Sequence, residues 1–210
     1  MISFWILALF ACLVGAKHVY AIERSDAIVL ARQLAEANGF ADQITFIQGD
    51  IHQITLPEKV DVITSELISK AVLGQKMAQT IGLCRERWLK PEGRIVPELV
   101  DLYVAPVQAA SFYQQLAFPN QSTFGLDFSA ATHFAYHNLA SLKISPESLL
   151  TKGQTAFTYD AYQATLDDRI RTTLSFDVQT SGTLHGYGAW FRSTLYDDIR
   201  LANDPPGLPA

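Results

Sequence analysis

Short apolar runs rich in β-branched residues alternate with helical patterns through the first 97 residues of this chain. The runs at 18–22, 44–47 and 59–64 have the length and composition of strands. One amphipathic segment lies between the first and second runs and another follows the third, and such alternation is typical of a parallel sheet covered by helices. We therefore expect an α/β fold with a doubly wound parallel sheet in this part of the chain.

Two segments next to these runs carry clear helix signals. The first starts at Ser25, a favoured N-cap residue, and continues at helical spacing to Gly39. The second covers residues 75–89 and has one apolar face. The Lys-Pro-Glu-Gly segment at 90–93 is expected to end this helix, and residues 94–96 then form a short strand.

The first sixteen residues form an apolar segment with two interpretations. One is a secretory signal peptide that ends in small residues, but no basic residue precedes Lys17. A membrane span is excluded because about 18 or more apolar residues are needed. The other interpretation is a buried helix that ends at Gly15 and leads into the first strand. We favour the helix because it continues the α/β alternation.

Beyond residue 97 the hydrophobic pattern changes to a period of two. Leu102 and Val104 alternate with polar positions, and residues 173–178 show the same alternation. This is the pattern of half-buried antiparallel strands. The sequence thus predicts an α/β domain at residues 1–97 and a β-rich domain at residues 98–210.

An acidic residue follows each of the first three apolar runs. Glu23, Asp50 and Glu66 all lie just past a predicted strand. Because ligands of open α/β sheets bind outside the carboxyl ends of the strands, the three carboxylates predict one acid-lined crevice. One such residue alone would be interpreted as a solvated loop or capping residue, but three in the same position indicate an enzyme or a cofactor-binding protein.

Composition restricts the class of protein further. With 210 residues, 49% of them hydrophobic, the chain can form a substantial core, which excludes a disordered or collagen-like protein. Its formal charge of −5 argues against nonspecific nucleic-acid binding and permits a cationic substrate. Cys12 and Cys84 lack zinc-type spacing, so we expect buried thiols and a cytoplasmic location.

Two histidines, His133 and His137, have the four-residue spacing of metal ligands on a helix. The glutamate of the metalloprotease motif is absent between them, and in a strand this spacing would separate the two rings. We therefore expect a structural or surface role for the pair and no metal site.

Several linked segments of the chain resemble the protein arginine N-methyltransferase family. Four of them follow the order and nearly the spacing of the family's cofactor domain: GAKHVYAIE, ARQLAEANGFADQITFIQGDI, LPEKVDVITSE and RWLKPEGRIVP. Three later segments are similar to the family's β-barrel domain: FGLDFS at 124–129, SPESLLT at 145–151 and HGYGAWF at 185–191. The resemblance implies a Rossmann-like methyltransferase sheet followed by an antiparallel β-barrel-like domain.

The resemblance also implies a reaction and residues that carry it. The family transfers a methyl group from S-adenosylmethionine to a guanidinium nitrogen. Glu23 would hold the ribose hydroxyls, and Asp50, Ile51 and His52 would lie against the adenine, with His52 in place of the family's acidic residue. Glu66 matches the first carboxylate of the family's substrate loop and would orient the guanidinium.

Three departures from the family pattern change what we expect of this chain. Gln75 occupies the position of the second substrate-loop glutamate, and an amide carries no charge to attract a guanidinium. The chain starts at Met1 about where a glycine-rich turn should lie, and it stops at Ala210 before the family's Thr-His-Trp segment. The sequence thus predicts a chain truncated at both ends that binds S-adenosylmethionine poorly.

Three functional hypotheses remain open from the sequence. The first is a methyltransferase-family protein whose chain, as given, is a fragment or a start-shifted product with reduced or no activity. Its expected partners are a second copy of the chain and an arginine-containing protein or a small molecule, without nucleic acid or membrane. The second is a noncatalytic relative that works as a dimerising or binding module. The third is a secreted β-rich binding protein, for which the mature chain would start at Lys17.

Overall fold

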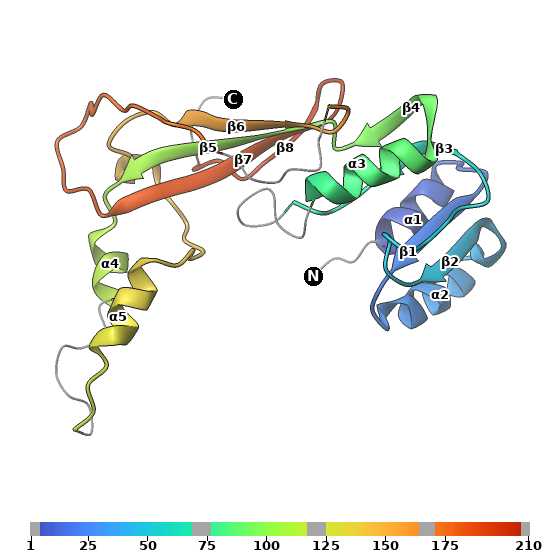
Figure 1. Ribbon diagram of the computed structural model, residues 1–210, viewed down its shortest axis with the longest axis horizontal. Coiled ribbons are helices and arrows are strands. Elements are labelled where there is room, and N and C mark those ends of the chain that lie inside the picture. Colours follow the sequence, from blue (N-terminus) through green and yellow to red (C-terminus); the bar gives the residue numbers. More distant parts are fainter. Residues whose placement is uncertain (1–4, 69–76, 117–124, 164–170, 207–210) are drawn as a thin grey trace.

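The computed structural model describes residues 5–68, 77–116, 125–163 and 171–206. Figure 1 shows an α/β part and an antiparallel sheet, with a pair of helices extending from the far end of that sheet. Among the described residues, none of the helices has both the length and the apolar character needed to span a membrane. Two single turns of 3₁₀ helix also lie among the described residues, at Ala41–Gln43 and Pro146–Ser148.

The first α/β unit consists of β1 (Val19–Glu23), α2 (Ala27–Ala37) and β2 (Ile44–Gln48). The two strands are parallel and in unbroken register, from Val19 opposite Ile44 to Glu23 opposite Gln48. Helix α2 returns the chain between them, so both strands end at the same edge. The sequence predicted these three elements.

The apolar N-terminal segment folds as helix α1 (Trp5–Leu13), which packs beside β1 and α2 (Figure 1). Ala8 and Cys12 are buried in one cluster with Ala35 and Ile44. Gly15 follows the helix with a φ of +97°, a conformation that residues with a side chain rarely adopt. The predicted helix before Gly15 is confirmed, but it is buried on one face only, since Phe10 and Leu13 are exposed.

The second α/β unit consists of β3 (Val60–Thr64), α3 (Met77–Trp88) and β4 (Leu89–Val96). Its strands are also parallel, with an irregular register between Val60 and Val62. Helix α3 ends close to the predicted position. The strand prediction at 94–96 was too short, because β4 already begins at Leu89. Its register against β3 jumps from Leu89 to Arg94 while β3 advances only from Val60 to Val62, and Gly93 lies close to Leu89 and Lys90, so residues 90–93 bulge out of the pairing.

The parallel strands form two separate pairs, whereas we expected one continuous sheet. In the described part of the chain, β1 hydrogen-bonds to β2 and β3 to β4, and the two pairs are not joined to each other. Each pair is a complete strand-helix-strand unit, so its internal hydrogen bonds form independently of the other pair.

The second half of the chain forms an antiparallel sheet of four described strands in the order β6-β5-β7-β8. Their bounds are β5 (Leu99–Val107), β6 (Gln154–Asp160), β7 (Gly186–Tyr196) and β8 (Ile199–Ala202). Strand β5 lies between β6 and β7 and pairs with β7 along its whole length. Gly188 of β7 lies where a Cβ atom would clash with Ile144, so the side-chain-free backbone allows close packing there.

The strand predicted at residues 173–178 is wrong. Leu174 and Phe176 are half-buried between exposed neighbours, as the alternation predicted, but Val178, the third apolar position, is 62% exposed. The segment nevertheless has no strand partner among the described residues, and its backbone is bonded at isolated points such as Gln154 Nε2 to the carbonyl of Ser175 (2.7 Å). The alternation of burial at residues 174 and 176 therefore arises without strand pairing.

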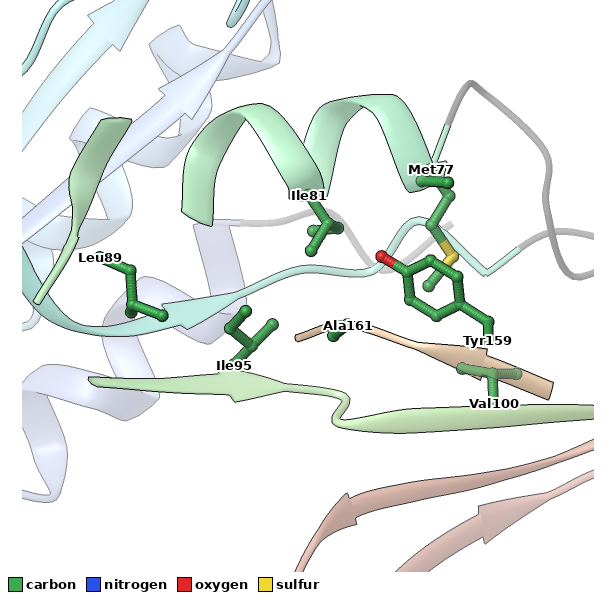
Figure 2. Packing of buried hydrophobic residues seen from close by; sticks show 8 residues of the cluster. Met77, Ile81, Leu89, Ile95, Val100, Tyr159 and Ala161 are labelled. Carbon is green, nitrogen blue, oxygen red and sulfur yellow. The ribbon is translucent and has the colours of Figure 1, made fainter. Parts of the chain in front are cut away.

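The largest hydrophobic cluster joins the α/β part to the antiparallel sheet (Figure 2). Met77 and Ile81 of α3 point into it from one side, and Val100 and Tyr159 from the other. Ile95 lies before the predicted domain boundary at residue 97 and is fully buried in the same cluster. The two parts therefore share a core rather than meeting through a linker.

Two short helices, α4 (Ala110–Leu116) and α5 (Ser129–Tyr136), extend beyond the end of the sheet (Figure 1). They contact each other, and the rings of Tyr113 and Tyr136 stack with centroids 4.5 Å apart. Apolar side chains remain exposed around the pair, with 69% of Phe134 and 77% of Leu139 accessible. We call residues 110–116 and 125–139 the helical arm.

Candidate active site

Glu23 is fixed at the carboxyl end of β1 by backbone hydrogen bonds. The amide of Ser25 donates to its Oε1 (2.7 Å), and the amide of Gly49 donates to its backbone carbonyl (3.1 Å). Among the described residues, Oε2 has no hydrogen-bond partner. One carboxylate oxygen is thus held in place while the other remains available to accept hydrogen bonds from a ligand.

The turn after β2 lies directly beside Glu23. Gly49 has a φ of +156°, which favours glycine, and it turns the chain away from the strand. Asp50 Oδ1 then accepts a hydrogen bond from the amide of His52 (2.9 Å), and the Asp50 carbonyl accepts one from the amide of Gln53 (2.8 Å). These local bonds give the turn a defined shape before any ligand binds.

Three further residues hold the turns after β1 and β2 in place. Gln48 Nε2 donates to Asp26 Oδ1 (3.1 Å), which joins the two turns across the strand ends. Arg87 of α3 donates to the carbonyl of His52 (3.1 Å). Sequence analysis missed these contacts. Gln48 was identifiable as the register partner of Glu23, whereas nothing in the sequence links Arg87 to a residue 35 positions away.

Glu66 lies two residues beyond the end of β3, in the second parallel pair. Its neighbour Ser65 still donates a backbone hydrogen bond to the carbonyl of Val96 (3.0 Å), and Leu67 and Ile68 pack against the shared core. Glu66 itself is exposed. The backbone on both sides is therefore anchored, and the carboxylate is free to meet a cationic group from solvent.

The structure brings four of the predicted site residues together. Glu23, Asp50, Ile51 and His52 lie together at the end of the β1/β2 pair. In the described ranges no strand pairing connects Glu66 to this group. Gln75 lies outside the described residues.

The two cysteines are unsuited to nucleophilic chemistry. Both are buried, as predicted. Burial raises the pKa of the Cys84 thiol to about 12, so this thiol stays protonated at neutral pH. Burial also raises the pKa of Cys12. The parts of the chain that the structure describes contain no group of three or more His, Cys, Asp or Glu side chains that could hold a metal ion.

Two family models match this chain. Residues 4–121 match a methyltransferase domain, and residues 100–207 match the PRMT5 oligomerisation domain. Protein arginine N-methyltransferase 2 of Dictyostelium discoideum is 32% identical over 195 residues, covering 89% of this chain and 38% of the relative. The Mus musculus protein of the same name is 35% identical over 182 residues, covering 83% and 41%. The chain thus spans about two fifths of the length of these relatives.

Solved structures with a similar fold cover almost the whole chain. The Trypanosoma brucei PRMT1 enzyme-prozyme heterotetrameric complex with AdoHcy superimposes with a TM-score of 0.79 at 25% identity, covering 97% of this chain and 66% of that one. Arabidopsis thaliana protein arginine methyltransferase 10 gives a TM-score of 0.77 at 25% identity, covering 96% and 67%.

The strand-end carboxylate, the α/β units and the antiparallel sheet that follows them define a Rossmann-like methyltransferase with a β-barrel-like second part, as the sequence predicted. Within that class the chain belongs to the protein arginine N-methyltransferase family.

Proposed function

We propose that this chain provides the adenosyl-binding crevice and one acceptor carboxylate of an S-adenosylmethionine-dependent arginine N-methyltransferase. The observation that carries this proposal is the junction of Glu23 with the turn after β2, where the Gly49 amide donates to the Glu23 carbonyl. A carboxylate and a preformed turn at the carboxyl ends of two parallel strands are the elements that a nucleoside needs.

Glu23 is suited to bind the ribose. Its Oε1 is positioned by the Ser25 amide, and its Oε2 can accept a hydrogen bond from a hydroxyl group. A ribose presents two neighbouring hydroxyls, which a carboxylate can accept together.

The turn formed by Asp50, Ile51 and His52 is suited to bind the adenine. Ile51 is half-buried and offers an apolar surface next to Glu23. The amide of His52 is already used by Asp50, and the carbonyl of His52 by Arg87, so the hydrogen bonds keep this turn in one conformation. Adenine recognition would rest on Asp50 and on contact with Ile51.

Glu66 is suited to orient a guanidinium. S-adenosylmethionine supplies an electrophilic methyl group, and the protein has to present a nitrogen of the acceptor to it. An exposed carboxylate on an anchored backbone can accept two parallel N–H bonds from a guanidinium and fix its plane. Gln75 would supply a neutral second acceptor, so we expect weaker guanidinium binding than with two carboxylates.

The helical arm is suited to hold a second copy of this chain. Its exposed apolar side chains lie within the residues that match an oligomerisation domain, and the Trypanosoma brucei relative was solved as a heterotetramer. We propose a homodimer in the cytoplasm that acts on an arginine-containing protein or a small molecule, without nucleic acid or membrane as a partner.

The proposed crevice can be tested by NMR titration of the 210-residue chain with S-adenosylmethionine, a method that also detects weak binding. We expect amide shifts at residues 23–25 and 49–53, and we expect Glu23→Gln to weaken binding about tenfold or more because a neutral amide is a poorer acceptor for hydroxyls. Glu36→Gln removes the same charge from an exposed position on α2 and should leave affinity unchanged. The proposal would be contradicted if Glu23→Gln bound S-adenosylmethionine as tightly as the unsubstituted chain. It would also be contradicted if the amides of residues 23–25 and 49–53 showed no shift at millimolar ligand.

A further inference from the structure

The end of α5 carries two histidine rings on its exposed side, remote in sequence from the crevice residues. His133 lies on the last turn of the helix, and His137 is its C-cap residue. Both side chains are exposed, and their rings stack with centroids 4.2 Å apart and planes inclined by 23°. The helix therefore places the two imidazoles side by side, which sequence spacing alone had left open.

The hydrogen bond of His137 determines which of its nitrogens can bind a ligand. Its Nδ1 lies 2.7 Å from the backbone carbonyl of His133. A carbonyl only accepts, so Nδ1 carries the proton and Nε2 keeps its lone pair. Metal-binding histidines have this arrangement, because a hydrogen bond from the second ring nitrogen fixes the tautomer and the ring orientation.

The spacing of the rings is compatible with one shared ion. Imidazole nitrogens bind Zn²⁺ at about 2.1 Å, so two nitrogens on one ion lie roughly 3 Å apart. The hydrogen bond to the His133 carbonyl holds the ring of His137, so the ring of His133 must turn until one of its nitrogens converges with Nε2 of His137. Because the His133 side chain is exposed, it has room for that rotation.

We propose that His133 and His137 form a binding site for one divalent transition-metal ion, with water in its remaining coordination positions. Imidazole selects Zn²⁺, Ni²⁺ or Cu²⁺ over Mg²⁺ and Ca²⁺, which prefer oxygen ligands. Two protein ligands make an open, exchangeable site, unlike structural zinc sites with four. A bound ion would connect the last helical turn to the C-cap residue and so stabilise the end of α5. The site is independent of methyl transfer.

Calorimetric titration of the 210-residue chain with NiCl₂ at neutral pH tests the site. We expect one ion per chain, and we expect His133→Gln and His137→Gln each to weaken binding at least about tenfold, because each removes one of two ligands. His18→Gln is the matched control, since His18 is also exposed but its Nε2 already lies 2.8 Å from Thr45 Oγ1. Equal affinity in the His133 variant, an equal loss in the His18 variant, or no binding at millimolar Ni²⁺ would each overturn the proposal.

Imidazole ¹⁵N NMR with ZnCl₂ gives a second measurement that does not depend on substitution. The Nε2 resonance of His137 should move on metal binding while its Nδ1 keeps the proton, as the bond to the His133 carbonyl requires. Movement of Nδ1 instead would show a different coordination mode and overturn the assignment of the ligating atom. Circular dichroism of the glutamine variants should match that of the unsubstituted chain, because both histidines are exposed.

Discussion

The α/β part and the antiparallel sheet obtain their order from contacts of very different range. At the crevice, Ser25 bonds to Glu23 and His52 bonds to Asp50 across two positions of sequence. In the sheet, β5 pairs with β7, so that Leu99 lies opposite Thr194. Local bonds shape each turn at the ends of β1 and β2, but distant residues join the turns: the Gly49 amide bonds to the Glu23 carbonyl, and Arg87 to the carbonyl of His52. Among the described strands of the sheet, β7 and β8 pair locally, and the other pairings join distant segments. The difference teaches that the shape of each turn depends on short segments, whereas the relative position of the turns, like most of the sheet, depends on distant contacts.

The largest expected effect tests whether the shared core dominates stability. Ile95→Ala should lower the free energy of unfolding by about 4 kcal/mol, because Ile95 is fully buried between both parts. Ile44→Ala removes the same atoms from the smaller cluster of α1, α2 and β2 and should lower it by about 2 kcal/mol. Urea unfolding followed by fluorescence measures both.

Ile199→Ala is the control for these two variants, because 56% of Ile199 is exposed on β8. Its free energy of unfolding should stay within about 0.5 kcal/mol of the unsubstituted chain. If Ile95→Ala and Ile44→Ala lowered the free energy of unfolding equally, the small cluster would stabilise the protein as much as the shared core does. That result would contradict the proposed difference between the two clusters.

The next effect tests whether the exposed apolar surface of the second half serves a partner. Phe134→Ser should raise the dimer dissociation constant about tenfold or more, since an aromatic side chain at an interface contributes on the order of 2 kcal/mol. Leu13→Ser changes a similarly exposed residue in the α/β part and should have no effect. Sedimentation velocity over a concentration series measures the dissociation constants of both variants. A monomeric unsubstituted chain would contradict the proposed homodimer.

The smallest effect concerns an exposed ion pair between β3 and β4. Lys90 Nζ lies 2.8 Å from Asp61 Oδ1, and this hydrogen bond lowers the pKa of Asp61 below its ordinary value of 3.8. A lowered folded-state pKa stabilises the protein above the unfolded value, and this contribution is lost as the pH falls through the folded value.

Lys90→Met should therefore raise the pKa of Asp61 toward 3.8 in an NMR titration, with little change in stability at pH 7 because the pair is exposed. Lys152→Met removes an exposed lysine from the other half and should leave the Asp61 titration unchanged. An Asp61 that titrates identically in the Lys90 variant would show that the pair does not persist in solution.

The same contrast of range explains what sequence reasoning could predict. Glu23 and Asp50 were identified because a strand and the residue after it are neighbours in sequence, and their position relative to each other follows from parallel pairing. Strand pairing itself is nonlocal, so the sequence predicted one sheet where the described strands form two pairs. It also predicted a strand at 173–178 from an alternation that arises without a partner strand. The role of Arg87 was invisible for the same reason.

Helix α3 connects the two halves of the molecule. Met77 at its start is buried against the antiparallel sheet, and Arg87 near its end holds the carbonyl of His52. Ten residues of helix, about 15 Å, separate these contacts. We expect a sliding or tilting of the sheet that carried Met77 with it to move Arg87 as well, and with it the turn beside Glu23.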